Sequence, residues 1–205
     1  MISHSIFQMA LLTDNRVCVL TTPDGNGHFY IQPFIRADRY REHVMGLELV
    51  ERPRIVVFGK EGRQNRNVGF FSDESKGYKY SRQMMASSPL TPELKKILTR
   101  VNRTFQEKYN GILVNRYVDG NDYIGKHKDD ESGLGDNGVV GIVYGATRKL
   151  RIRDSEGKIV EDLIVSDGYM YQMDSEFNRV YTHEIPVEKK VKGERISLTF
   201  RHHTE

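Results

Sequence analysis

The sequence predicts a mainly β fold of the α+β class, with an all-β sandwich or jelly roll in its C-terminal half and one supporting helix. Three observations lead to this prediction. Apolar residues alternate in seven short segments after Gly111, turn-forming residues separate these segments, and one amphipathic helix precedes them. Short strands in such number, without a helix between them, are typical of a sandwich or jelly roll.

The composition fits a single domain spanning residues 1–205, with 38% hydrophobic and 29% charged residues. No uncharged stretch approaches the roughly 20 residues of a membrane span, and residues 1–15 lack the basic start of a secretory signal. Cys18 is the only cysteine, which excludes an internal disulfide and a zinc site made of several thiolates. We therefore expect a soluble intracellular monomer, nuclear in a eukaryote and otherwise cytoplasmic. The net charge of +3 permits nucleic-acid binding without establishing it.

The first 88 residues are expected to form irregular short strands and loops, with turn signals at 22–25 and 61–62. The clearest helix follows them. Thr91 is a suitable N-cap and Pro92 suits the first helical position. An apolar stripe then recurs at helical spacing, formed by Leu94, Ile97, Leu98, Val101 and Phe105.

The strand-like segments begin after this helix. Turns are expected at 119–122, 154–157 and 166–168. The predicted strands are 112–118, 139–144, 149–153, 158–165, 169–173, 180–185 and 195–201.

His127 and Asp129 are the first candidate metal ligands. Residues two apart in an extended chain point to the same side, so both can reach one ion. His183, in an apolar-flanked segment, is the leading candidate for a third ligand. Two histidines and one carboxylate suit Fe(II) oxygen chemistry better than zinc hydrolysis. The alternative is a chance His-x-Asp pair and a hydrogen-bonded core histidine, while His202 and His203 are expected to be frayed tail residues.

The last predicted strand carries Arg195 and Arg201 on one face, together with Ser197 and Thr199. On an open sheet this face would meet water. Inside a jelly roll, a buried guanidinium requires an anion, and a dicarboxylate beside the metal would supply it. Asn115 and Tyr117 share one face of the 112–118 strand and can donate further hydrogen bonds.

Three segments together resemble the AlkB family of Fe(II)/2-oxoglutarate dioxygenases. They are NRYVDGNDYIGKHKDDE at 115–131, His183, and PVEKKVKGERISLTFR at 186–201. The resemblance runs from about residue 56 to residue 201 and is closest to the eukaryotic members that repair duplex DNA. It implies a double-stranded β-helix core at about 89–205, preceded at about 1–88 by an N-terminal extension and nucleotide-recognition region.

By position, the resemblance implies that His127, Asp129 and His183 are the catalytic iron ligands. The implied 2-oxoglutarate contacts are Asn115, Tyr117, Arg195, Thr199 and Arg201. Many relatives have Asn where this chain has Ser197, which affects one co-substrate hydrogen bond and leaves the ionic contacts in place.

The implied activity is oxidative demethylation of 1-methyladenine and 3-methylcytosine in DNA, single-stranded or duplex, with RNA as a further polymer. Fe(II), 2-oxoglutarate and O2 are the implied cofactor and co-substrates, and succinate, carbon dioxide and formaldehyde the products.

The resemblance also implies contacts with the base and the duplex. Asp130 and Glu131 match positions that line the base pocket, where carboxylates favour cationic lesions; otherwise they belong to a solvated loop. Stacking on an extruded base is implied for Tyr78 and Tyr80, which ordinary sheet packing would equally explain. A duplex wedge is implied for Phe58, flanked by Gly59 and Lys60, and a core phenylalanine before a turn is the alternative. Basic residues interleaved with these aromatics, Arg63 and Arg66 among them, suit contact with a phosphate backbone, and ordinary surface charge is the alternative.

Two alternatives of other classes stay open. A 2-oxoglutarate-dependent protein hydroxylase or demethylase would keep the iron and co-substrate residues but would not need Phe58, Tyr78 and Tyr80. A catalytically inactive jelly roll that only binds nucleic acid would not need a complete set of ligands and arginines.

Overall fold

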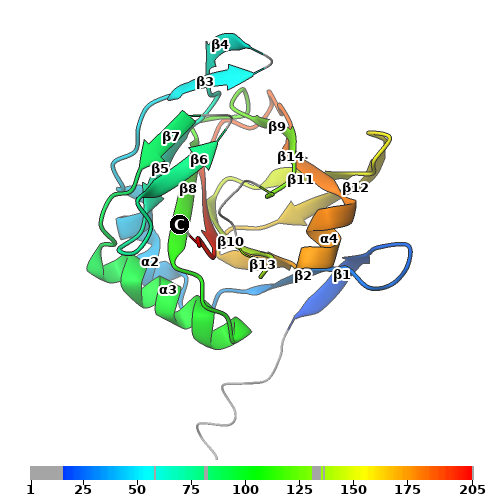
Figure 1. The fold of residues 1–205 in the computed structure, drawn as a ribbon, viewed down its shortest axis with the longest axis horizontal. Helices are drawn as coiled ribbons and strands as arrows, with labels where there is room; N and C mark the ends of the chain where they lie inside the picture. The colour runs from blue at the N-terminus through cyan, green and yellow to red at the C-terminus, as the bar shows by residue number, and fades with distance from the viewer. Residues whose placement is uncertain (1–15, 58, 81–82, 131–134, 136, 205) are drawn as a thin grey trace, which may run out of the picture.

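The structure is a computed structural model that describes residues 16–57, 59–80, 83–130, 135 and 137–204. Two antiparallel sheets form its body (Figure 1). The larger sheet has seven strands, in the order β1 (Val17–Thr21), β2 (His28–Pro33), β13 (Tyr169–Met173), β10 (Val139–Gly145), β15 (Arg195–Arg201), β8 (Gly111–Tyr117) and β5 (Asn67–Phe71). The smaller has four, in the order β12 (Ile159–Val165), β11 (Arg148–Arg153), β14 (Thr182–Ile185) and β9 (Ile124–His127).

The two sheets face each other across a shared apolar core. Val143 and Tyr171 of the larger sheet belong to the same buried cluster as Leu150, Ile152 and Ile185 of the smaller one. Alternation along each strand sends every second side chain into this core. The mainly β prediction is therefore confirmed, and the arrangement is that of a jelly-roll sandwich.

Two hairpins stand apart from these sheets. One is formed by β3 (Arg54–Val57) and β4 (Lys60–Arg63), the other by β6 (Gly77–Tyr80) and β7 (Gln83–Ala86). The β3–β4 hairpin projects from one end of the body, and β6–β7 lies between it and the larger sheet (Figure 1).

Helix α3 (Pro92–Phe105) confirms the predicted helix. The hydroxyl of Thr91 accepts a hydrogen bond from the backbone N–H of Leu94 at 3.2 Å, which caps the helix as expected. Leu94 and Ile97 are fully buried and pack with Ile142 and Leu198 on the outer face of the larger sheet. None of the helices in the described part of the chain is long and apolar enough to cross a membrane.

Within the described residues, the prediction missed helices α2 (Asp38–Met45) and α4 (Ser175–Val180) and strand β9. Helix α2 lies beside α3 against the same sheet (Figure 1). Helix α4 separates β13 from β14, so the expectation of strands without a helix between them is wrong. The helix is too short for its periodicity to stand out, but Asp174 caps it by accepting a hydrogen bond from the N–H of Phe177 at 2.8 Å.

The expectation of a frayed tail is wrong for His203. Its side chain packs against Phe70, with 4.7 Å between the ring centroids. Its backbone N–H donates to the side-chain oxygen of Asn110 at 2.7 Å, and its carbonyl accepts from the same side chain at 2.8 Å. These bonds extend the ordered structure two residues beyond β15.

Candidate metal and anion site

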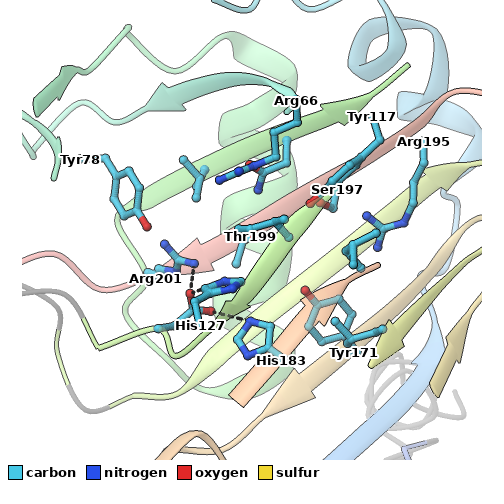
Figure 2. Close-up of a pocket in the computed structure, with 16 residues that line it drawn as sticks. Arg66, Tyr78, Tyr117, His127, Tyr171, His183, Arg195, Ser197, Thr199 and Arg201 are labelled. Carbon is cyan, nitrogen blue, oxygen red and sulfur yellow. Dashed lines mark hydrogen bonds and ion pairs between the residues drawn. The ribbon is translucent and has the colours of Figure 1, made fainter. Parts of the chain in front are cut away.

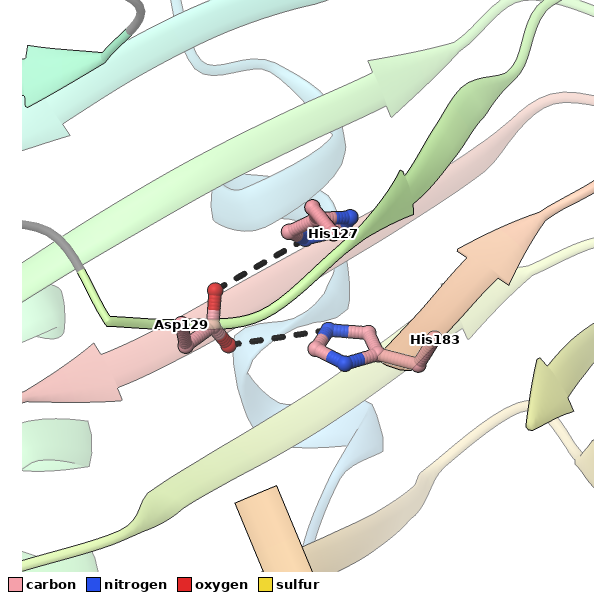
Figure 3. Close-up of side chains that lie close together, drawn as sticks. All are labelled: His127, Asp129 and His183. Carbon is pink, nitrogen blue, oxygen red and sulfur yellow. Dashed lines mark ion pairs between the residues drawn. The ribbon is translucent and has the colours of Figure 1, made fainter. Parts of the chain in front are cut away.

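The structure brings His127, Asp129 and His183 together at the edge of the smaller sheet (Figure 3). His127 ends β9 and His183 lies in β14, and the two residues are direct partners in the pairing of these strands. Asp129 follows β9 by two residues. Its carboxylate oxygens lie 3.7 Å from His127 Nε2 and 3.6 Å from His183 Nε2. One ligand atom from each side chain therefore falls within 4.8 Å of the others.

Hydrogen bonding fixes the His127 ring in the state that a metal requires. Its Nδ1 lies 2.9 Å from the carbonyl oxygen of Gly125. Because a carbonyl can only accept, Nδ1 carries the proton and the lone pair of Nε2 faces Asp129.

Burial and charge set the protonation states of the three side chains. Burial, followed by the neighbouring His183, lowers the pKa of His127 to about 3. Burial likewise lowers the pKa of His183. For Asp129, burial alone would raise the pKa, but the Arg201 guanidinium and the two histidines outweigh it and lower the pKa. At neutral pH the site therefore offers two neutral imidazoles and one carboxylate, the forms that bind a divalent cation.

The polar face of β15 points into a pocket next to this triad (Figure 2). The space between its lining residues, counted together with the part that opens to solvent, is about 440 Å³. Arg201 donates a hydrogen bond to the Asp129 carboxylate, which joins the pocket to the triad. The other predicted co-substrate residues also line it: Asn115, Tyr117, Arg195 and Thr199, with Ser197 between the last two.

Arg195 is the strongest sign that this pocket receives an anion. Its side chain is only 2% exposed, and its Nε and Nη1 have no hydrogen-bond partner among the described residues. Burial lowers the pKa of this guanidinium, which means that its charge is poorly compensated. The aromatic ring of Tyr117 lies 5.4 Å away and compensates the charge only in part. A carboxylate at this position would complete the site, so the pocket fits a dicarboxylate bound beside a metal.

The predicted base-contact residues divide into two groups. Tyr78 lines the pocket, and Figure 2 shows its hydroxyl directed inward. The residue is 4% exposed, and its ring centroid lies 5.8 Å from that of Phe70 and 5.2 Å from the guanidinium carbon of Arg201. Asp130 is exposed and is not one of the residues that line the pocket.

The other group belongs to the hairpins. Gly59 and Lys60 are exposed on the β3–β4 hairpin. Tyr80 is the last residue of β6, and only its backbone is described. Phe58 and Glu131 lie outside the described residues.

Arg66 differs from its expected position among surface basic residues. It is 4% exposed and lines the pocket, where its Nε donates a hydrogen bond to the side-chain oxygen of Asn115 at 2.7 Å. A side chain so enclosed is poorly placed to follow a phosphate backbone. This burial argues against a phosphate contact of Arg66, and its predicted contact with substrate, now from within the pocket, stays a prediction.

Sequence reasoning missed Tyr171, which lines the pocket from β13. Burial raises the pKa of its hydroxyl to about 12, so the phenol stays protonated. Opposite it, Gly141 provides the necessary space, because a Cβ there would lie 2.2 Å from the Tyr171 ring. A glycine within an otherwise apolar strand is the signal that could have indicated this close approach.

These features define an oxygenase-type jelly roll, with a His-Asp-His triad beside a buried arginine. Residues 40–201 match the family described as the 2OG-Fe(II) oxygenase superfamily, and the chain belongs to this superfamily. The match starts before residue 56, where the sequence resemblance was expected to begin. It confirms the predicted enzyme class, a dioxygenase, and the predicted Fe(II), 2-oxoglutarate and O2.

Similar proteins confirm the resemblance to the AlkB family. DNA oxidative demethylase ALKBH2 of Bos taurus is 34% identical over 157 residues, which cover 72% of this chain and 56% of the relative. Alpha-ketoglutarate-dependent dioxygenase alkB homolog 3 of Mus musculus is 29% identical over 60% of this chain and 47% of the relative. The chain thus spans about half the length of these curated relatives.

A solved structure titled "The structure of OsALKBH1" shares the fold. It superposes with a TM-score of 0.55 at 18% identity, covering 85% of this chain and 96% of that one. This agreement confirms the double-stranded β-helix core.

Proposed function

We propose that this dioxygenase oxidatively removes methyl groups from alkylated nucleic-acid bases, with 1-methyladenine and 3-methylcytosine in DNA as its substrates. The single observation that supports it most is the His127–Asp129–His183 triad in one pocket with the buried Arg195 guanidinium, whose Nε and Nη1 have no hydrogen-bond partner among the described residues. Similarity to proteins named as DNA oxidative demethylases supports the choice of substrate.

In this proposal, His127, Asp129 and His183 hold Fe(II), and 2-oxoglutarate is held by Asn115, Tyr117, Arg195, Thr199 and Arg201. When bound, iron and 2-oxoglutarate supply the oxidation of a C–H bond by O2, with succinate and carbon dioxide as products. Hydroxylation of an N-methyl group gives an unstable adduct that releases formaldehyde and the unmodified base.

The side chains of the pocket bind, orient and exclude water. Arg195 and the Tyr117 hydroxyl bind the distal carboxylate of 2-oxoglutarate. Arg201 keeps Asp129 ionised and correctly turned, because its guanidinium pairs directly with that carboxylate. Leu150 and Ile185 line the same pocket and exclude water from it.

Base recognition involves the pocket mouth and the hairpins. The inward hydroxyl of Tyr78 contacts the extruded base, and Tyr80, Asp130 and Glu131 supply further contacts with it. Phe58 fills the gap left in a duplex, and the exposed Lys60 of the β3–β4 hairpin contacts phosphate.

An oligonucleotide panel tests this proposal. Strands carrying 1-methyladenine or 3-methylcytosine, single-stranded and duplex, are incubated with Fe(II), 2-oxoglutarate and O2, and mass spectrometry follows the loss of about 14 Da per methyl group. We expect loss of the methyl group, with formaldehyde and succinate formed in equal amounts. The Asp129→Asn variant, which keeps the shape of the carboxylate, is the inactive control.

Two results would contradict the proposal. Succinate formation without turnover of any alkylated oligonucleotide would favour a protein hydroxylase or demethylase. Binding of nucleic acid without binding of iron and 2-oxoglutarate would indicate an inactive binding module.

The role of Phe58 needs a separate comparison. Phe58→Ala should reduce activity on duplex DNA more than on single strands, because only a duplex has a gap to fill. Equal losses on the two substrates would exclude the wedge.

A further inference from the structure

Arg148, at the start of β11, is one of the most deeply buried side chains of the protein, although it lies outside the pocket. The residue is 1% exposed, and its side chain is fully enclosed. Among the other arginines of this strand, Arg151 and Arg153 keep about a fifth of their side chains exposed and pair with nearby carboxylates. Such complete burial of a permanent charge requires an equally complete set of acceptors.

Those acceptors come from two loops. Nη1 and Nη2 donate to the backbone carbonyls of Asp119 and Asp122, at 3.0 and 2.9 Å, in the loop after β8. Nη2 also donates to the carbonyl of Pro186 at 2.6 Å, and Nε to the carboxylate of Glu188 at 3.1 Å, in the loop between β14 and β15. One guanidinium thus joins both loops to the end of the smaller sheet.

The two loops also bond directly to each other. The N–H of Gly120 donates to the carbonyl of Val191 at 2.9 Å, and the N–H of Glu188 donates to the carbonyl of Gly120 at 2.8 Å. Their contact is so close that a Cβ on Gly120 would lie 1.9 Å from the Glu188 carbonyl oxygen. Small displacements of either loop therefore move the other.

These loops are the continuations of the strands that carry the anion site. The first follows Tyr117 at the end of β8, and the second leads into Arg195 at the start of β15. Tyr117 and Arg195 are direct partners in the pairing of these strands. The guanidinium carbons of Arg148 and Arg195 lie 5.9 and 5.4 Å from the centroid of the Tyr117 ring. Arg148 and Arg195 therefore both lie next to the Tyr117 ring, which connects the contacts of Arg148 with the anion site.

We infer that Arg148 is a positioning residue for the co-substrate: by tying the loops at 119–122 and 186–191 together, it holds Tyr117 and Arg195 in place to receive the distal carboxylate. The inference deepens the 2-oxoglutarate part of the proposed function and does not depend on the nucleic-acid substrate. A demethylation assay that fails would therefore leave it intact.

The test compares Arg148→Met with Arg151→Met, which removes a partly exposed arginine from the same strand. Titration of the anaerobic Fe(II) protein with 2-oxoglutarate, followed through the metal-to-ligand charge-transfer band, gives the affinity. Arg148→Met should weaken 2-oxoglutarate binding by about 10- to 100-fold, and Arg151→Met by less than about twofold. The kcat measured at saturating 2-oxoglutarate should change much less than the KM for 2-oxoglutarate.

Hydrogen exchange of the protein without metal gives a second readout. The amides of Gly120, Glu188 and Val191 make the bonds within and between the loops, so Arg148→Met should speed their exchange by at least about tenfold while amides of α3 keep their rates. A general loss of stability would instead accelerate exchange throughout the protein.

Two milder variants keep the test decisive if Arg148→Met fails to fold. Arg148→Lys retains the charge but cannot reach all four acceptors, so it should restore 2-oxoglutarate affinity only in part. Glu188→Gln, which keeps the shape of the side chain and removes its charge, should weaken 2-oxoglutarate binding about threefold. Folded variants with wild-type affinity and wild-type exchange at the three amides would overturn the inference.

Discussion

The metal and anion site and the two hairpins are held in place by different means. The site is carried by β8, β9, β14 and β15, strands that pair on at least one side within the two main sheets. Each hairpin forms its own two-stranded sheet, and all four residues of β4 are exposed. Side-chain positions in the site are therefore fixed by strand register and burial, whereas the exposed residues of β4 are held mainly by the pairing of β4 with β3.

The comparison indicates which region of the molecule specifies the reaction and which region selects the substrate. The chemistry depends on buried charges whose positions tolerate little movement. Recognition of a polymer depends on exposed residues, each of which contributes modestly and in a salt-dependent way. Variants in the two regions should consequently differ in the size and in the kind of their effects.

The largest effect is expected at the triad. Asp129→Asn should lower turnover by about 10³-fold or more, because it removes the charged iron ligand and the partner of Arg201. Iron content and kcat are the measurements, and circular dichroism checks the fold. Turnover within tenfold of wild type would show that Asp129 is not a ligand.

A loss of about 30- to 1,000-fold in 2-oxoglutarate affinity is expected for Arg195→Met, which removes the guanidinium proposed to bind the distal carboxylate. The charge-transfer titration measures it, with Arg103→Met, an exposed residue of α3, as control. Since an uncompensated buried charge disappears, the melting temperature should stay the same or rise. Unchanged affinity would show that a residue other than Arg195 binds the carboxylate of 2-oxoglutarate.

A moderate effect is expected at the β3–β4 hairpin. Replacing exposed Lys60 and Arg63 with Gln should weaken duplex DNA binding a few-fold and reduce the slope of log affinity against log salt by about 1 to 2. Affinity for 2-oxoglutarate should not change. Lys96 and Arg103 of α3, changed to Gln, provide the matched control, and an equal loss there would argue against a specific contact of the hairpin with DNA.

The smallest effect on activity is expected at His203, which packs beside Tyr78 where the pocket meets the β6–β7 hairpin. Burial lowers the pKa of His203 to about 4, below its ordinary value of 6.5. The unfolded chain therefore takes up a proton more readily, and the free energy of unfolding should fall as the pH is lowered from about 6.5 to 4.

His203→Leu should remove this part of the acid sensitivity, about 1 to 3 kcal/mol between these pH values. Urea unfolding at pH 7 and at pH 4.5 measures the difference between the variant and the wild type. Parallel losses of stability in the two proteins would place the sensitivity elsewhere, for example in the buried histidines of the triad.

Local patterns in the sequence were sufficient for much of this architecture. The spacing of His127 and Asp129, the Thr91 cap and the alternation of 195–201 depend only on helix and strand periods, and these periods do not change with context. The segments of β8, β10, β11, β12, β13 and β15 were located to within one or two residues for the same reason.

Only the tertiary structure decided which faces and segments meet. The inward direction of Arg195 and Arg201 follows from closing one sheet over the other, since the same alternation on an open sheet would expose them. The pairing of β9 with β14 selected His183 as the neighbour of His127. Arg66 and Arg148 look like any surface arginine in the sequence. Their burial results from hydrogen bonds to residues between 26 and 49 positions away, and no local pattern reports such contacts.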